Sequence, residues 1–238
     1  MWDNPRLLNS VAGILTGIAL LLLGFAAAQL LLRTSLFPVR EITVRGKLAH
    51  TTPDQIAQAA RGHIDGNFFA VDLAELRDAL QQLPWVRSVS VRRLWPDRLE
   101  VRLEEHVPFA HWGADALVDS DGERFAAQSD AALPFLIGPD GTEAEVTQRF
   151  RSFAALLAPL GKKPVRVELS PRYAWRLWLD DGLQVALGRD TDEHPVEARL
   201  ARFVAVYAQT LAKTPQRYTY VDLRYPNGFA LRGAGSKG

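Results

Sequence analysis

Residues 83–105 read LPWVRSVSVRRLWPDRLEVRLEE and decide the fold of the first globular part of the chain. Apolar residues recur among polar ones in both halves of this stretch: Val86, Val89, Val91, Leu99, Val101 and Leu103. Alternation of this kind predicts β-strands with one apolar and one polar face. The tripeptide Trp95-Pro96-Asp97 supplies turn residues between the strands. We therefore predict a pair of antiparallel strands joined by a tight turn, with one face of the pair exposed to solvent. The side chains expected to face water there are Arg92, Arg98, Glu100, Arg102 and Glu104.

The sequence before this pair predicts one more strand and two helices. Residues 37–44, FPVREITV, alternate as a strand. Thr52 and Gln55 have the spacing of a capping box with Pro53 at the first helical position, which predicts a helix to about Arg61. A second helix carries leucines at helical spacing until a proline ends it: Leu73, Leu76, Leu80, Leu83 and Pro84. The expected order is β-α-α-β-β, with the helices on one sheet face.

Beyond a plausible boundary at Pro108 the pattern predicts more strands and two further helices. The helices are expected over residues 143–160 and 195–213. Strands are expected at residues 165–169, 175–179, 183–187, 219–225 and 229–232, the last two as a terminal hairpin around Pro226-Asn227-Gly228. These elements, together with the first unit, predict an α+β fold class.

Residues 11–32 form an apolar run of 22 residues without a charge. As a helix this run is about 33 Å long, which matches a hydrocarbon core of about 30 Å. We expect an uncleaved membrane anchor; Ala26-Ala27-Ala28 leaves open a signal peptide cleaved after Ala28. Charge bias would place the following domain in the cytoplasm, because basic residues are more frequent after the run than before it. That rule is weak for long domains, so the residues alone leave the orientation open.

Composition excludes several classes of function. The chain has no cysteine, which rules out thiol nucleophiles, disulfides and cysteine-ligated metals. Its 28 Lys and Arg residues against 27 Asp and Glu residues lack the basic excess of nucleic-acid-binding proteins. We therefore expect neither covalent cysteine chemistry nor nucleic-acid recognition.

Motifs for catalysis or cofactor binding are weak. No two of the five histidines have the spacing of a helical metal site, and His106 and His111 have no carboxylate at a motif spacing. Residues 119–123, DSDGE, are predicted to form a hairpin turn rather than a calcium loop. The glycine-rich residues 233–238 are expected to form a flexible tail. We predict no enzyme activity, no metal and no cofactor.

Aromatic residues in the second part of the chain are expected to divide between two sheet faces. Trp175 and Trp178 have opposite parity on one strand, so one is expected in the core and the other at the surface. The terminal hairpin is a candidate sheet edge, whose backbone another chain can pair with. An edge kept soluble by its charges is the competing interpretation.

Three segments in order, FPVREITVRG, LPWVRSVSVRRLWPDRLEVRLEEHVPFA and YVDLRYPNGFALR, resemble the bacterial FtsQ/DivIB cell-division family. The resemblance implies a short cytoplasmic tail (1–10), a transmembrane helix (11–32), a POTRA domain (36–107), an FtsQ-type β domain (108–232) and a flexible tail (233–238). It also implies an inner-membrane protein at the division septum, with its N-terminus in the cytoplasm and its domains in the periplasm.

The role implied by this resemblance is a non-enzymatic scaffold that binds FtsB and FtsL and helps control septal cell-wall synthesis. The implied partner-binding residues are Tyr220, Arg224, Tyr225, Pro226, Asn227, Gly228, Phe229, Ala230 and Leu231, with Arg172 as a further basic candidate. The alternatives are a POTRA-type chaperone or transport accessory that binds extended peptides, and a secreted enzyme released at Ala28.

Overall fold

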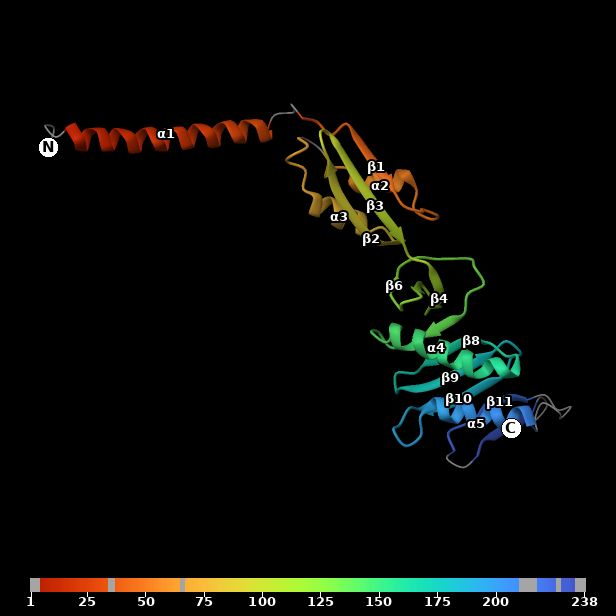
Figure 1. The fold of residues 1–238 in the computed structure, drawn as a ribbon. Helices are drawn as coiled ribbons and strands as arrows, with labels where there is room; N and C mark the ends of the chain where they lie inside the picture. The colour runs from red at the N-terminus through yellow and green to blue at the C-terminus, as the bar shows by residue number, and fades with distance from the viewer. Residues whose placement is uncertain (1–4, 34–36, 65–66, 210–217, 226–227, 234–238) are drawn as a thin grey trace. The chain divides into compact units, whose positions relative to one another are not determined.

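A computed structural model describes residues 5–33, 37–64, 67–209, 218–225 and 228–233. The chain divides into two compact units, Met1–Glu105 and His106–Gly238 (Figure 1). Each unit has its own hydrophobic core, and each is described by itself.

Helix α1 spans Pro5–Arg33. Its stretch Asn9–Ala27 has a mean hydropathy of 2.2, and none of it is buried. Nineteen residues of helix are about 29 Å long, close to the thickness of the hydrocarbon core. α1 is therefore a candidate transmembrane helix by length and composition. It begins inside the stretch expected as a tail.

The rest of unit 1 is a three-stranded sheet with two helices. Its elements are β1 Glu41–Arg45, α2 Pro53–Ala60, α3 Leu73–Gln81, β2 Val86–Leu94 and β3 Arg98–Glu105. The strand order is β1-β3-β2, with β1 parallel and β2 antiparallel to β3. Thr52 and Gln55 form the expected capping box on α2, and Asp72 caps α3. Both helices pack on one face, where Ile56 and Leu80 meet the β3 residue Leu99.

The prediction that Glu100 faces water is wrong. Glu100 is only 3% exposed, although it lies on the sheet face opposite the helices. The guanidinium of Arg45 reaches its carboxylate at 3.0 Å and that of Arg92 at 2.7 Å. Because β3 is the central strand, arginines from both neighbouring strands fold over it. Alternation along a strand indicates on which sheet face a residue lies. It does not indicate that side chains from the neighbouring strands cover that residue.

Unit 2 is built on a nine-stranded sheet in the order β12-β11-β10-β9-β8-β7-β4-β5-β6. The strands are β4 Pro108–Trp112, β5 Ala116–Asp119, β6 Arg124–Phe125, β7 Phe135–Ile137, β8 Pro164–Leu169, β9 Ala174–Leu179, β10 Gln184–Arg189, β11 Tyr218–Asp222 and β12 Ala230–Gly233. The helices are α4 Glu143–Leu157, continued by a 3₁₀ turn at Ala158–Leu160, and α5 Val196–Gln209.

Helices α4 and α5 cover the same face of the sheet (Figure 1). Phe153 of α4 and Phe203 of α5 are fully buried against strand residues such as Leu177. Trp175 shares this face and is 2% exposed, whereas Trp178 lies on the opposite face and is half-buried. The predicted division of the two tryptophans is confirmed.

The α+β fold class is confirmed, with three differences in detail. Strands β4 and β7 lie in segments for which the sequence predicts no strand. The final hairpin does form, but β12 begins at Ala230 and the connection after Asp222 is longer than a tight turn. Moreover, β11 joins β10 in parallel after the α5 crossover. Parallel strands are joined by a long crossover and not by a tight turn, so the sequence holds no turn motif that would indicate this pairing. The periodicity of the two strands does not indicate it either.

Gly122 and Gly182 allow a matched test of packing at two turns. Both have positive φ angles, +82° and +87°, where a side chain is strained. A Cβ at Gly122 would strike the backbone of Ala144 at the start of α4, whereas one at Gly182 meets open space. We expect Gly182→Ala to cost about 1 kcal/mol of unfolding free energy and Gly122→Ala about 1–3 kcal/mol more. Urea titration of the full chain in detergent measures both, and equal losses would contradict the packing argument.

Candidate partner-binding edge of the second unit

The edge strand β12 has one sheet neighbour among the described strands, β11. Their antiparallel register pairs Tyr220 with Arg232, Val221 with Leu231 and Asp222 with Ala230. The other side of β12 displays backbone N–H and C=O groups that no described strand pairs with. An extended segment of another chain can use these groups to add a further strand.

The hydrophobic core fixes this edge in place. The Phe229 ring meets the Phe203 ring of α5 edge-on, with 5.6 Å between centroids. Leu231 packs against the same core from the strand itself. Both side chains therefore pack toward the core while keeping part of their surface exposed.

Arginine and aromatic side chains line the opposite, helix-free face next to the edge. One cross-strand row there runs Arg166, Trp178, Gln184, Tyr220 and Arg232, one residue from each of β8 to β12. Within this row the Arg166 guanidinium lies 4.7 Å from the Trp178 ring centroid, and that of Arg232 lies 5.5 Å from Tyr220. Trp, Tyr and Arg are the residue types most enriched at energetic centres of interfaces. We call this row and the neighbouring Arg176 the arginine–aromatic face.

Arg224 is held rigidly at the end of β11. Its Nε and Nη2 donate to the Asp222 carboxylate at 2.8 and 2.6 Å, and its backbone N–H donates to Oδ1 at 3.1 Å. Its stem crosses β10 at Gly188, where a Cβ would come within 2.9 Å of the Arg224 Cγ. The side chain is still 62% exposed. The arrangement presents a fixed, accessible cation beside the edge strand.

The ion pair sets the protonation of both groups. The Arg224 guanidinium lowers the pKa of the Asp222 carboxyl, and this outweighs burial, which raises it. Asp222 in turn raises the pKa of Arg224 above its usual value. Both groups are therefore charged at neutral pH.

The structure places the predicted site residues in several different surroundings. Arg224, Tyr225, Gly228 and Ala230 are exposed at the edge, and Tyr225 retains 55% of its surface. Arg172 lies in the β8–β9 turn, at the end of the sheet where β11 also ends. Phe229 and Leu231 face the core, Tyr220 is half-buried on the helix-free face, and Pro226 and Asn227 lie outside the described residues.

Sequence reasoning missed the contribution of distant strands to this surface. Arg166 and Arg176 precede Tyr220 by more than forty residues and come to the same sheet face, three and two strands away, only through the strand order. The one available signal in the sequence is the alternation of side chains along each strand. It predicts the sheet face on which an arginine lies, but it does not predict which strands lie next to one another.

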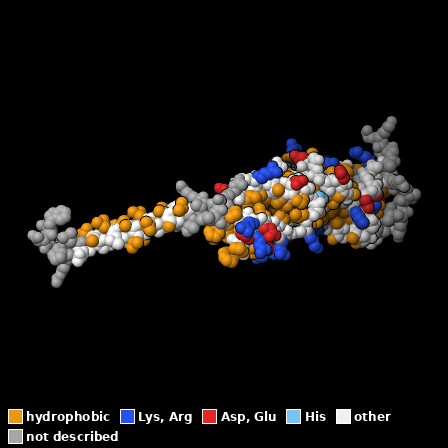
Figure 2. Space-filling view, turned by 90° about the horizontal axis from the view of Figure 1, so that it is seen from above, with side chains coloured by type: hydrophobic (Ala, Val, Ile, Leu, Met, Phe, Trp, Pro, Cys, Tyr) orange, Lys and Arg blue, Asp and Glu red, His pale blue; other side chains and the backbone are white. Residues whose placement is uncertain are grey.

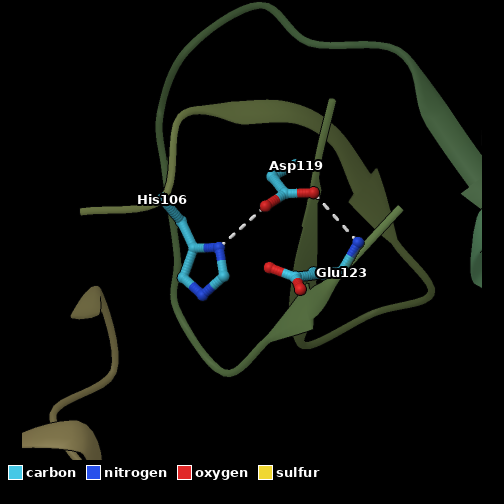
Figure 3. A group of neighbouring side chains, drawn as sticks. All are labelled: His106, Asp119 and Glu123. Atoms are coloured by element: carbon cyan, nitrogen blue, oxygen red, sulfur yellow. Dashed lines mark hydrogen bonds and ion pairs between the residues drawn. The ribbon is translucent and has the colours of Figure 1, made fainter. Parts of the chain in front are cut away.

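A separate cluster near the start of unit 2 brings together His106, Asp119 and Glu123 (Figure 3). The Asp119 Oδ2 lies 2.9 Å from His106 Nδ1, while Oδ1 accepts from the backbone N–H groups of Asp121 and Glu123, each at 2.9 Å. The His106 ring stacks on Phe125 at 4.4 Å. Asp119 thus joins β5 to β6 in a hairpin turn, as predicted. His106 does have a carboxylate partner, which lies too far along the chain to form a motif.

These contacts already engage His106 Nδ1 and both carboxylate oxygens of Asp119. Burial raises the pKa of Asp119, but the hydrogen bonds from His106 and from the turn backbone outweigh it and lower the pKa overall. A metal bound between His106 and Asp119 would have to replace their mutual hydrogen bond. The cluster therefore acts as a structural clasp of the turn.

The Asp222–Arg224 pair predicts how stability depends on pH. Because the pKa of Asp222 is lowered in the folded state, its contribution is complete above about pH 4 and is lost as pH falls through the folded pKa. We expect Asp222→Asn to lose roughly 1 kcal/mol of unfolding free energy at pH 7, after allowance for solvent screening, and to show a flatter decline below pH 4. Urea titrations from pH 7 to 2 measure this. Asp115→Asn, in the exposed β4–β5 turn, should match the parent chain, and a parallel decline of all three would refute the role of the pair.

Family models of known proteins match both units of the chain. The family model "Cell division protein FtsQ/DivIB, C-terminal" matches residues 110–224, and "POTRA domain, FtsQ-type" matches residues 37–106. A cell division protein FtsQ of Burkholderia pseudomallei is 43% identical over 100% of this chain and 96% of its own length. Those of Nitrosospira multiformis and Neisseria gonorrhoeae are 42% and 33% identical, each over 98% of this chain and over 99% and 96% of their own lengths. The chain belongs to the FtsQ/DivIB family of cell division proteins.

Proposed function

We propose that this protein is a membrane-anchored scaffold of the division machinery that binds FtsB and FtsL through β12. The observation that carries the proposal is the edge strand with one described neighbour, beside the arginine–aromatic face. The relatives' printed names describe a role in cell division. At the septum such a scaffold would help control cell-wall synthesis.

Backbone pairing alone supplies too little free energy for a stable complex. β12 has four residues, and the backbone N–H and C=O groups of only alternate residues point away from β11, toward a partner strand. Each main-chain hydrogen bond contributes about 1 kcal/mol net, so the pairing amounts to a few kcal/mol. A Kd of 1 μM requires about 8 kcal/mol. Side chains beside the strand must therefore contribute most of the affinity.

The side chains next to β12 favour an acidic partner segment. The two helix-free rows that reach the edge, together with Arg224, contain four arginines, Arg166, Arg176, Arg224 and Arg232, against the two acids Glu168 and Asp222. Tyr225 adds an exposed ring at the start of the β11–β12 connection. We infer that the partner combines an extended strand with flanking Asp or Glu residues.

The proposed topology places the N-terminus in the cytoplasm and both units in the periplasm. The apolar helix α1 fits a single-pass inner-membrane protein. Long domains cross the membrane despite an adverse charge bias, so the basic residues after α1 are compatible with this orientation.

Tyr225→Ala is expected to weaken capture of FtsB by roughly tenfold, since loss of an exposed interface tyrosine commonly costs 1–2 kcal/mol. The measurement is co-purification of FtsB with the full chain in detergent. Phe135→Ala is the matched control, because Phe135 is 48% exposed but lies in β7, five strands from β12. Hydrogen exchange reads the backbone directly: amides within residues 230–233 should gain protection when FtsB is added. Unchanged exchange there, or an equal loss in the control, would contradict edge pairing.

Topology is tested by reporters fused after Gly238. A periplasm-active phosphatase should be active in that fusion, and a reporter active only in the cytoplasm should be silent. The same pair of reporters fused before residue 5 serves as the opposite control. The reverse pattern would overturn the proposed orientation while leaving the family assignment intact.

A further inference from the structure

Three exposed aromatic side chains lie at one end of unit 1. Phe37, Phe69 and Trp95 retain 44%, 49% and 81% of their surfaces. Among the described residues of unit 1 outside α1, only Val44 is a comparably exposed large apolar side chain. We call Phe37, Phe69 and Trp95 the aromatic tip.

The strand arrangement brings these residues to the same end. The backbone N–H of Phe68 donates to the Phe37 carbonyl at 2.7 Å, and the Phe37 and Phe69 rings meet edge-on at 5.6 Å. The N–H of Arg40 donates to the Asp97 carbonyl at 2.9 Å, which ties the entering chain to the β2–β3 turn that carries Trp95. The start of β1 and this turn lie together at one end of the sheet (Figure 1).

The tip is held rigidly rather than being a loose loop. The Arg93 guanidinium donates to the carbonyls of Phe68, Phe69 and Val71 at 3.0, 3.3 and 2.5 Å. The Asn67 side chain accepts from the Phe69 N–H at 3.0 Å. Phe68 is buried in the core, so its neighbour Phe69 is fixed with its ring outward. An outward aromatic ring on a fixed support is available to a partner surface at little entropic cost.

Chain length places this tip at the membrane surface. The apolar run of α1 ends at Leu32, and three residues separate Arg33 from Phe37. Four residue steps span at most about 14 Å, so Phe37 lies within that distance of the helix end. The interfacial layer of a bilayer is the region where aromatic rings are enriched.

Two exposed arginines lie beside the tip, Arg40 and Arg98. Each has one acidic neighbour, Asp97 at 3.6 Å from Arg40 and Glu41 at 3.9 Å from Arg98. The Arg40 side chain is 74% exposed and that of Arg98 is 50% exposed. Figure 2 shows hydrophobic side chains beside Lys or Arg and Asp or Glu side chains at the end of unit 1 where the chain enters it. Basic residues near a surface rich in anionic lipid are attracted to it.

We propose that the aromatic tip docks into the interfacial layer of the lipid bilayer, with the neighbouring arginines at the level of the lipid phosphates. Unit 1 is then held against the membrane by a second contact besides α1. This inference rests on the membrane anchoring in the proposed function.

The absence of native cysteine allows a direct test by spin labelling. The full chain carrying Trp95→Cys is labelled with a nitroxide and reconstituted in vesicles of phosphatidylethanolamine and phosphatidylglycerol. Collision of the label with oxygen and with a water-soluble nickel chelate reports its depth. Gln81→Cys, exposed at the end of α3 and separated from the tip by the length of β2, is the aqueous control. We expect the label at position 95 to lose nickel collisions and gain oxygen collisions relative to position 81.

A second pair of variants separates docking from a folding defect. Phe37→Ser with Phe69→Ser should return the label at position 95 to the nickel accessibility of position 81, whereas Val44→Ser should not. Docking is overturned if the label at position 95 is as accessible to nickel as that at position 81 in the parent chain, as it would be if the tip binds a protein instead. Flotation of the vesicles distinguishes the two proposals: a chain that fails to float refutes the anchor, and a chain that floats with an aqueous tip refutes only the docking.

Discussion

A backbone N–H or C=O group at the edge of a sheet has no strand to bond and must find water or another chain. The sheet of unit 2 is open, so it ends at β6 and at β12. β6 has only two residues and is backed by the clasp of Asp119, so little backbone is displayed there. β12 is longer, and its apolar residue Leu231 packs against the core together with Phe229, which directly precedes the strand. In the proposed complex, recognition would depend on main-chain groups of β12 and on side chains from neighbouring strands.

One-sided helix packing has a second effect. Because α4 and α5 share one face of the sheet, the other face must be made compatible with water by its own side chains. In unit 2 this is done by stacking arginines on Trp178 and Tyr220, and in unit 1 by folding arginines over Glu100. Arginine suits both tasks because its planar guanidinium stacks on rings and pairs with carboxylates. The same residues that shield the sheet become a surface on which an acidic segment can bind.

Local signals in the sequence predicted most of the helices and strands of unit 1. In unit 2 they predicted helices α4 and α5 and strands β8 to β10. Capping residues, the Trp95 turn and the leucines of α3 are all decided within a few positions of one another. What could not be predicted depends on distant pairing. The covered carboxylate of Glu100, the bond between His106 and Asp119, and the parallel join of β11 to β10 arise only when separate strands meet. At the candidate site the edge and Tyr225 were predictable, whereas the arginines of β8 and β9 and the inward turn of Phe229 were not.

The attachment of β12 to a single neighbour has a consequence for turnover of the protein in the cell. Residues bonded on one side only separate from a sheet more readily than those bonded on both, so β12, like β6 at the other end, is a place where unit 2 can open locally. A partner that pairs with β12 binds the closed form alone and raises the free energy of opening in proportion to the logarithm of its concentration. Proteases that act on the opened strand would then remove unassembled copies faster than assembled ones. The amount of this protein would follow the amount of its partner without any dedicated control.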